Sequence, residues 1–536
     1  MSKIHYSFQQ LPFSDLFKTY ISDYSKLDSF YSANPFDDKA VKEKAELLKH
    51  PVLKQKFVNA LSEYHEYLGI SESQSSQLAK FQKEESIAIV TGQQLGVFGG
   101  PLFTVYKTIT TILLARKWEK ILKKPVIPVF WLADEDHDFD EIASVGIPNY
   151  DAFKSIKLDQ EGNGQPVSVQ KIIETINEFR SLVKDELPDT DFSEIIFQEL
   201  EQYYIEGKSH VQAFAQLMNS WFSEEGLLIV GSNYSSIKKL LVNPFKNSIT
   251  KSEKISEVLE FKSAQLEKDF HSQVLVGSSN LFLVDPDQGR LKLEKSNGEW
   301  KAGNFTFSEV ELISNIVENP ENFSPNVFLR PIIQDLLLPT LGYVAGPGEL
   351  AYYGQMKDLY RFYDLEMPVI FPRLSITLIE SGIERIMVKL PFAMHSYNQR
   401  IEDLEAAYVD QTNSKDIEGV FSNWKNAILE VSEKPNSLIT DIDQTLDGTM
   451  GKVIAGFGNE IDKLKGKVYR SIKQQEQTQL NRIAKIKSQL FPDGLQERSV
   501  SPIYFMNKYG VDIWSNLLND FESEELDITK HHIISL

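Results

Sequence analysis

The stretch that decides the fold is ESIAIVTGQQLGVFGGPLFTVYKTITTILLARKWEKILKKPVIPVFWLA, residues 85–133. Its two ends, ESIAIV and PVIPVFWLA, are short apolar runs rich in β-branched and aromatic residues, which is typical of buried strands. Between them lies a glycine-rich turn, TGQQLGVFGG, followed by a helical segment with Pro101 near its first turn. Strand, turn, helix and strand in this order predict a βαβ unit with parallel strands and a right-handed crossover.

The same order of elements returns twice further along the chain. SHVQAFAQLMNSWFSEEG leads into the strand LLIVGS, and PGELAYYGQMKDLYRFYDLEM leads into PVIFPRLS, with TLGYVAG as the strand before this last unit. Three such units predict an α/β protein with a doubly wound parallel sheet. The segments at about 150–208 and 232–326 are expected to be insertions, and the second contains the hairpin-like NLFLVDPDQGRLKLEKSNGEW.

The chain has 536 residues, which at roughly 150 residues per domain predicts two or three compact units. We expect residues 1–84 to be a helical lead-in and 85–380 to be the core with its two insertions. Residues 381–490 are expected to form a helical coiled-coil domain, and 491–536 a return segment that packs on the core.

The coiled-coil prediction depends on the stretch from about 437 to 490, which contains no proline. Apolar residues there step by four and three, at Phe457, Ile461, Leu464 and Val468. A long helix of this kind needs an apolar neighbour, so it should lean on a preceding antiparallel helix, on another subunit, or on both.

Composition excludes several classes of protein. Lys and Arg number 56 against 76 Asp and Glu, a net charge of −20, so nucleic acid and anionic membranes are not favoured partners. The absence of cysteine removes disulfides, thiolate nucleophiles and Cys-ligated metal sites. The N-terminal residues do not resemble a signal peptide, and the longest apolar run, VIPVFWLA, is too short to span a membrane. We therefore expect a cytoplasmic protein.

The loops that follow the strands are the first candidates for a site, because ligands of open parallel sheets bind at the carboxyl ends of the strands. After the first strand the turn and the next helix carry a group of glycines and polar side chains, namely Gly92, Gln93, Gln94, Gly96, Gly99, Gly100, Thr104 and Lys107. Backbone N–H groups at a helix start can hold an anion. The spacing matches neither the dinucleotide nor the P-loop pattern, and a tight turn without a ligand is the alternative.

After the second strand, Trp131 is followed by a dense polar group that includes Glu135, Asp136, His137 and Asp138. One imidazole among carboxylates can supply a general base or a metal site. The alternative is a solvated acidic loop.

A third group of polar residues interrupts apolar surroundings at Arg330, Gln334, Tyr343, Glu349 and Tyr352. Arg373 follows the strand PVIFP in the same way. A buried arginine needs a carboxylate or phosphate partner, so a ligand contact and a structural salt bridge, such as Arg330 with Asp335 or Glu349, are equally compatible with the sequence. The histidine pair His531 and His532 is expected to lie in a disordered tail.

Five of these strings, TGQQLGVFGGPLFTVYK, PVIPVFWLADEDHDFDEI, SPNVFLRPIIQDLLLPTLGYVAGPGELAYY, MPVIFPRLS and LFPDGLQER, resemble the cysteine-adding enzymes of bacillithiol biosynthesis, the BshC family. The resemblance covers nearly the whole chain in order, and only loosely the two insertions. It implies a Rossmann-like core with two connective insertions and a C-terminal antiparallel coiled coil that forms a homodimer.

The resemblance further implies a ligase that joins the carboxyl group of L-cysteine to the amine of glucosaminyl-malate. Lys107, Glu135 and His137 are then expected to be catalytic, with Glu135 or His137 as the base, and a turn of Gly92, Gly96, Gly99 and Gly100 to hold phosphate. The expected substrate-binding residues are Gln93, Gln94, Thr104, Trp131, Asp136, Asp138, Arg330, Gln334, Tyr343, Glu349, Tyr352 and Arg373.

A nucleotide, ATP or ADP, is the implied source of activation, because an amide does not form from a free carboxylate in water without a leaving group. The family is associated with ADP near the coiled coil and the returning tail, where the matching residues here are Pro492, Asp493, Gly494, Gln496 and Arg498. A metal requirement stays open. Two other functions remain compatible with the sequence: another adenylate-forming or nucleotidyl-transfer enzyme, and a non-catalytic dimeric scaffold.

Overall fold

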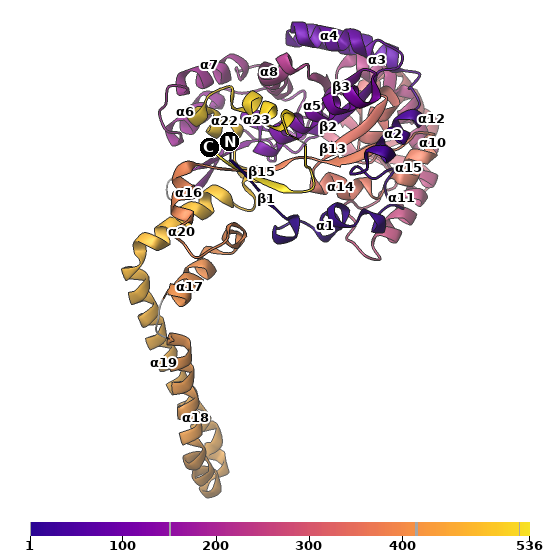
Figure 1. Cartoon of the computed structure of the whole chain (residues 1–536). Coiled ribbons are helices and arrows are strands. Elements are labelled where there is room, and N and C mark those ends of the chain that lie inside the picture. Colours follow the sequence, from indigo (N-terminus) through magenta and orange to yellow (C-terminus); the bar gives the residue numbers. More distant parts are fainter. Residues whose placement is uncertain (1, 150–151, 413–415, 525) are drawn as a thin grey trace. The chain divides into compact units, whose positions relative to one another are not determined.

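The computed structural model describes residues 2–149, 152–412, 416–524 and 526–536. The chain folds as two compact units (Figure 1). The first combines Met1–Asn149, Phe153–Leu378 and Asp493–Ile534, and the second consists mainly of Ile379–Pro492. The segment after Pro492 therefore belongs to the first unit as far as Ile534.

The first unit is built on a five-stranded parallel sheet, as the sequence predicts. Its strands are β2 (Ile87–Gln93), β3 (Val126–Leu132), β6 (Leu228–Gly231), β13 (Thr340–Ala345) and β14 (Val369–Pro372). Their order in space is β14-β13-β2-β3-β6, and all pairs are parallel. From β2, the next strands in sequence, β3 and β6, are added on one side of the sheet. The later strands, β13 and β14, are added on the other side of β2. The strand order reverses between β2 and β13, which is where an open α/β sheet forms its ligand crevice.

Helix α5 (Leu102–Leu122) connects β2 to β3 and packs on both strands. It is buried on nearly all sides, as expected for a helix whose apolar residues are not confined to one face. Its buried threonines satisfy their hydroxyl groups within the helix, since Thr108, Thr110 and Thr111 each donate to the carbonyl four residues earlier. The polar residues of α5 therefore do not prevent it from lying in the core.

The other helices of this unit surround the sheet. They are α1 (Asp15–Ser22), α2 (Asp38–Leu47), α3 (Lys54–Leu68), α4 (Glu72–Phe81), α8 (His210–Phe222), α13 (Leu329–Leu337), α14 (Pro347–Tyr353), α15 (Lys357–Phe362), α21 (Gln496–Ser499), α22 (Pro502–Tyr509) and α23 (Ile513–Glu522). Within the described residues, no helix is both long enough and apolar enough to cross a bilayer.

Two segments interrupt the alternation of strands and helices. Around the first lie β4 (Ser144–Pro148), β5 (Phe153–Lys157), α6 (Thr175–Glu186) and α7 (Ser193–Tyr203). The second contains α9 (Ser235–Lys238), α10 (Val242–Thr250), α11 (Ser252–Leu266), β7 (Leu281–Asp285), β8 (Gly289–Lys292), β9 (Glu294–Ser296), β10 (Glu299–Ala302), β11 (Phe305–Phe307), α12 (Glu309–Glu318) and β12 (Phe323–Pro325). The predicted hairpin is present as the antiparallel pair β7 and β8.

A smaller sheet joins segments from both ends of the chain. Strand β16 (His531–Ser535) lies between β1 (Ser2–Tyr6) and β15 (Ser375–Ile379). The prediction of a disordered tail at His531 and His532 is therefore wrong, because both side chains are buried in this sheet. The apolar Ile533 and Ile534, which follow them, are buried as well and explain why the segment folds as a strand.

The second unit consists of helices, and two of them form a long hairpin. Its members are α16 (Ser381–Met387), α17 (Ile401–Thr412), α18 (Ile417–Ile442), α19 (Asp447–Gln475) and α20 (Gln477–Leu490). Figure 1 shows α18 and α19 side by side, and ion pairs of Lys425 with Asp462 and of Lys465 with Glu418 connect them. The stretch over 437–490 is not one continuous helix, since the chain turns back at 443–446 and the helix is interrupted again at Glu476.

Helix α3 covers the free edge of the large sheet at β6. The fully buried His65 accepts a hydrogen bond from the Ile229 backbone N–H at its Nε2, at 2.9 Å. Burial lowers the pKa of His65 to about 4, so the imidazole is neutral in the folded protein.

We expect the contribution of His65 to stability to depend on pH. As pH falls from about 6.5 towards 4, the unfolded chain binds a proton that the folded chain excludes, so the free energy of unfolding falls by up to about 3 kcal/mol. The variant His65→Gln keeps an acceptor for Ile229 and lacks this titration. Urea unfolding of both proteins from pH 7.5 to 4.5 should show their stability difference shift in favour of the variant at low pH, and a constant difference would contradict the expectation.

Candidate functional site

A cavity of about 1090 Å³ lies in the first unit at the carboxyl ends of β2, β13 and β14. Its wall includes Gly92 and Gln93 from the end of β2, Gly346 after β13 and Arg373 after β14. These are the strands on either side of the reversal in strand order. The cavity is large enough for more than one small substrate.

Lys107 reaches this cavity from the second turn of α5. Its Nζ donates hydrogen bonds to the Gly92 carbonyl, at 2.7 Å, and to Gln93 Oε1, at 2.9 Å, and forms an ion pair with Glu349. Burial lowers the pKa of Lys107 to about 8, although the Glu349 carboxylate favours the charged form. The ammonium group is therefore held in place by three acceptors and loses its proton more readily than an exposed lysine.

Glu349 organises the opposite wall. Its carboxylate accepts hydrogen bonds from the Tyr343 hydroxyl, at 2.7 Å, and from the Gly346 backbone N–H, at 2.8 Å. Arg330 lies close by and donates to the Tyr352 hydroxyl at 2.9 Å. Neither of the salt bridges considered for Arg330, with Asp335 or Glu349, is formed. Among the described residues, no carboxylate lies within ion-pair distance of this guanidinium.

The carboxylates that follow β3 are buried and partnered. Glu135 lines the cavity and forms an ion pair with Lys238, which comes from α9 in the second insertion and is almost fully buried. Asp134 accepts hydrogen bonds from the Ser232 hydroxyl, at 2.6 Å, and from the Asn233 backbone. Burial, with the nearby Glu135 charge, raises the pKa of Asp134 to about 7.

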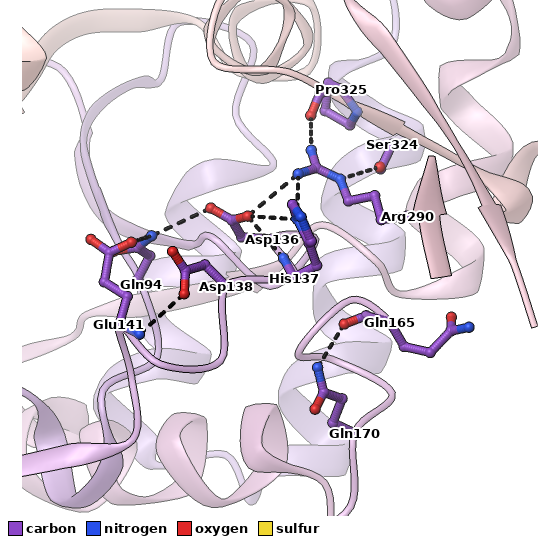
Figure 2. Close-up of polar contacts among 10 residues, drawn as sticks. All are labelled: Gln94, Asp136, His137, Asp138, Glu141, Gln165, Gln170, Arg290, Ser324 and Pro325. Atoms are coloured by element: carbon purple, nitrogen blue, oxygen red, sulfur yellow. Dashed lines mark hydrogen bonds and ion pairs between the residues drawn. The ribbon is translucent and has the colours of Figure 1, made fainter. Parts of the chain in front are cut away.

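Asp136 is held from three sides, as Figure 2 shows. It accepts hydrogen bonds from the His137 backbone N–H, at 2.8 Å, and from Arg290 Nη1 and Gln94 Nε2, both at 3.3 Å. Burial opposes ionisation, but Arg290 and these hydrogen bonds hold the pKa of Asp136 below its ordinary value. Gln94 also donates to Glu141, so one amide connects two carboxylates.

Arg290 is a site residue that the sequence did not point to. It lies on β8 of the predicted hairpin, and its guanidinium carbon is 3.8 Å from the centroid of the Phe282 ring. It donates hydrogen bonds to Ser324 Oγ and the Pro325 carbonyl (Figure 2). The hairpin was predicted, but nothing in its sequence says that Arg290 would reach a loop more than 150 residues earlier. The second insertion thus contributes both Arg290 and Lys238 to the site.

His137, predicted to be catalytic, does not line the cavity. Its side chain is 44% exposed, and its Nδ1 lies 3.4 Å from both Asp136 and Arg290. Asp138 also lies outside the cavity wall, where it accepts a hydrogen bond from the Glu141 backbone. Within the part of the chain that the structure describes, no three His, Asp or Glu side chains are arranged to hold a metal ion.

Most glycines of the turn that is predicted to hold phosphate pack closely against other parts of the chain. Of its glycines only Gly92 lines the cavity. A Cβ on Gly96 would lie 2.5 Å from the Gly100 Cα, and a Cβ on Gly99 would lie 2.6 Å from the Trp221 ring. The N–H groups of Gly99, Gly100 and Leu102 all donate to backbone carbonyls, the last to Val500 at 2.8 Å. These three N–H groups of the expected anion cradle are therefore bonded to the chain itself.

Four further candidates are buried away from the cavity. Trp131 and Thr104 lie in the core, and the buried Tyr343 donates its hydroxyl proton to Glu349. Gln334 donates to Asp335, whose pKa is raised to about 6 by burial. The sequence identified polar residues at the right strand ends, but it could not tell which of them face the cavity.

The tail contributes directly to the cavity. Arg373 donates to both carboxylate oxygens of Glu497, at 2.8 and 2.9 Å, and both side chains are buried. Arg498 and Leu495 also line the cavity. Glu497 was missed by the sequence analysis, although it lies inside the LFPDGLQER motif.

The remaining tail residues do not line this cavity. The Gln496 amide is bonded to both the N–H and the carbonyl of Leu378, and Asp493 and Gly494 form a turn with positive φ. Pro492 belongs to the second unit. Of the residues expected to contact a nucleotide, only Arg498 therefore faces the cavity.

We expect Arg373→Met to destabilise the protein by about 3–5 kcal/mol, because it leaves the Glu497 carboxylate buried without its cation. The matched variant Arg330→Met removes an arginine from the same cavity that has no carboxylate partner, and should cost only about 1 kcal/mol. Urea unfolding of both variants measures the contrast. Equal losses of stability would contradict it.

The sequence matches two family models that follow one another along the chain. Residues 1–374 match "Bacillithiol biosynthesis BshC, N-terminal Rossmann-like domain", and residues 376–536 match "Bacillithiol biosynthesis BshC, C-terminal coiled-coil domain". The fold described above, a Rossmann-like sheet and a helical unit with a long hairpin, agrees with both descriptions.

Curated relatives align with almost the full length. A protein of Salinibacter ruber named "Putative cysteine ligase BshC" is 31% identical over 534 residues, which cover 98% of this chain and 96% of the relative. Proteins of the same name from Oceanobacillus iheyensis and Chlorobaculum tepidum are 30% and 31% identical and cover 90% and 87% of this chain, and 91% and 86% of their own lengths. The chain therefore belongs to the BshC family of bacillithiol-biosynthesis proteins.

Proposed function

We propose that this protein joins the carboxyl group of L-cysteine to the amine of glucosaminyl-malate, forming bacillithiol. The name of the relatives supports a cysteine ligase, and the charges of the cavity support substrates that bear carboxylates and an amine. The observation that carries the proposal is that three charged side chains of the cavity, Arg330, Arg498 and Glu141, form no ion pair with another described residue.

Most charged side chains of the cavity neutralise one another. Lys107 is paired with Glu349, Arg290 with Asp136, Arg373 with Glu497, and Glu135 with Lys238 behind the wall. Among the described residues, Arg330 and Arg498 lack an acidic partner, and Glu141 lacks a basic one. Both substrates carry carboxylates that suit the two arginines, and both carry an amine that suits Glu141.

The paired cations have a different role from the unpaired ones. Glu349 and Glu497 fix the orientation of Lys107 and Arg373 before a substrate binds, so these cations can stabilise charge without rearranging. We assign to Arg330 and Arg498 the binding of substrate carboxylate or phosphate groups. Lys107 and Arg373 then face the charge that develops as the amide forms.

The attacking amine must lose a proton. Of the two bases considered, Glu135 lines the cavity and His137 does not, so we assign the role to Glu135. Glu141 is the second carboxylate in reach, and burial raises its pKa, which makes it a better proton acceptor than an exposed glutamate. The chain has no cysteine, so the substrate thiol is not selected through a disulfide or a Cys-ligated metal of this chain, and pocket shape or a non-cysteine contact must select it.

Activation of the cysteine carboxylate requires a leaving group, and we propose that ATP supplies it. Attack of the carboxylate on the α-phosphate would give an adenylate and pyrophosphate, and attack on the γ-phosphate would give an acyl phosphate and ADP. In both cases the amine then displaces the phosphate-bearing group and forms the amide. Arg330, Arg498 and Lys107 are the side chains suited to the phosphates, whereas the glycine-rich turn is not.

The test is mass spectrometry of the purified protein incubated with L-cysteine, glucosaminyl-malate, ATP and magnesium. We expect bacillithiol, with AMP in equal amount for an adenylate or ADP for an acyl phosphate. Folded protein that forms no bacillithiol with any nucleotide would contradict the proposal. That outcome would favour a different acceptor or the non-catalytic scaffold.

Two variants in the loop after β3 test the assignment of the base. Glu135→Gln should lower kcat by about 100-fold or more, because a positioned base contributes on that order. His137→Ala, which changes an exposed side chain in the next turn, should keep kcat within about threefold. Circular dichroism checks that both fold, and a greater loss in His137→Ala would reverse the assignment.

We further propose that the protein is a homodimer through the α18–α19 hairpin. Apolar side chains on this hairpin are exposed in the single chain, including Trp424, Leu438, Ile442, Val453 and Phe457. Isolated apolar residues are common on surfaces, but a series along one hairpin is typical of a helical interface.

Light scattering should give a mass twice the 61.2 kDa of the chain. Replacing Phe457 and Leu438 by Lys should convert the protein to a monomer without unfolding it, because both side chains are already exposed. Ile461→Lys is the contrasting variant, since Ile461 is buried within the chain and its replacement should disrupt the hairpin itself. A monomeric wild type would contradict the proposal.

A further inference from the structure

A series of buried, hydrogen-bonded polar side chains extends from Arg373 to strand β16. Glu497 accepts hydrogen bonds from Arg373, from the Ser375 hydroxyl at 3.0 Å and from the Ile376 backbone N–H at 3.1 Å. Ser375 Oγ also contacts His531 Nδ1 at 2.8 Å, and His531 Nε2 contacts Thr377 Oγ1 at 2.9 Å. His531 comes from β16, and its imidazole is fully buried.

In this series of side chains, the donor and the acceptor of each hydrogen bond follow from the states of Glu497 and Ser375. Burial opposes the charge on Glu497, yet Arg373 and Ser375 hold its pKa below its ordinary value, so the carboxylate is ionised and can only accept. The Ser375 hydroxyl has a single proton, which it donates to Glu497. Ser375 must therefore accept from His531, which fixes the proton of the imidazole on Nδ1.

The other end of the imidazole is consistent with this assignment. Burial lowers the pKa of His531 to about 4, so the ring is neutral and its Nε2 is an acceptor. The Thr377 hydroxyl supplies the matching donor. Both ring nitrogens and all four polar groups in the series are therefore satisfied.

The imidazole controls how Glu497 is held. Because the His531 N–H occupies a lone pair of Ser375, the Ser375 proton is directed at the carboxylate. Without that N–H the hydroxyl can rotate towards another acceptor, and Glu497 loses one of the donors that fix its plane. The plane of Glu497 sets the plane of the Arg373 guanidinium, because the two form a bidentate pair.

We propose that His531 is a positioning residue of the active cavity, which acts through Ser375 and Glu497 to orient Arg373 towards the anionic group of a substrate. The role of Arg373 towards a substrate is that of the proposed function above, on which this inference rests. His531 itself touches no substrate, since it does not line the cavity.

Two substitutions of His531 separate positioning from structural support. His531→Asn places an amide N–H near the position of Nδ1 and can still donate to Ser375. His531→Gln places its amide near the position of Nε2, where it meets Thr377 and not Ser375. Both variants replace a buried imidazole by a smaller amide, so their stabilities in urea should be similar.

We expect different kinetics from the two variants in the bacillithiol assay. His531→Gln should raise the KM of the substrate whose anion lies on Arg373 by about fivefold to tenfold, with kcat within about twofold, on the scale of one charge-assisted hydrogen bond. His531→Asn should keep both KM values within about twofold. Ser375→Ala should match His531→Gln, and the double variant should be no worse than either alone. Equal KM values in the Asn and Gln variants, or additive effects in the double variant, would overturn the inference.

Crystal structures of the two variants decide the inference even if the wild type forms no bacillithiol, a result that would count against the proposed function alone. In His531→Gln the guanidinium of Arg373 should leave the plane of the Glu497 carboxylate, while in His531→Asn the bidentate pair should remain. The same Arg373 geometry in both structures would overturn the positioning role.

Discussion

A charge buried at the carboxyl edge of the sheet must have an opposite charge or strong hydrogen bonds beside it, and much of this structure satisfies that requirement. Lys107, Arg373 and Glu135 lie near the ends of three different strands or on the helix between them, and each would be costly to bury alone. Their partners, Glu349, Glu497 and Lys238, come from separate parts of the chain. The second insertion and the tail are thereby tied to the central sheet by electrostatics as well as by packing.

The need of each buried charge for a partner also explains which features could be predicted from the sequence and which could not. Local patterns were enough for the sheet, because each strand is a short apolar run and each crossover helix lies between two of them. The strand-end positions of Glu135 and Arg373, and the place of Lys107 on the helix after β2, also followed from topology. Their partners did not, because an ion pair such as Arg373 with Glu497 joins residues that are 124 positions apart, and a single sequence carries no signal for that distance.

Other errors of prediction have local causes. Glycine is required both where a backbone approaches a ligand and where it approaches another side chain, and Gly99 against Trp221 is of the second kind. The sequence of the polar loop after β3 does not show which of its side chains face the cavity and which face solvent. In the structure Asp136 lines the cavity, whereas His137 is exposed. The sequence over 437–490 did not reveal the turn at 443–446. Asp443 caps this turn by accepting a hydrogen bond from the Thr445 backbone N–H, but aspartate is also common on helix surfaces and so gives no clear signal.

The position of β16 has a consequence for the synthesis of the protein. This strand lies between β1 and β15, so the sheet to which all three belong cannot close before residues 531–535 have been synthesised. Until β16 leaves the ribosome, Ser375 and Thr377 have no histidine to bond, although the five strands of the large sheet have already been made. A nascent chain that has not yet reached β16 can therefore form the large sheet before the hydrogen bonds that hold Glu497 and Arg373 are complete.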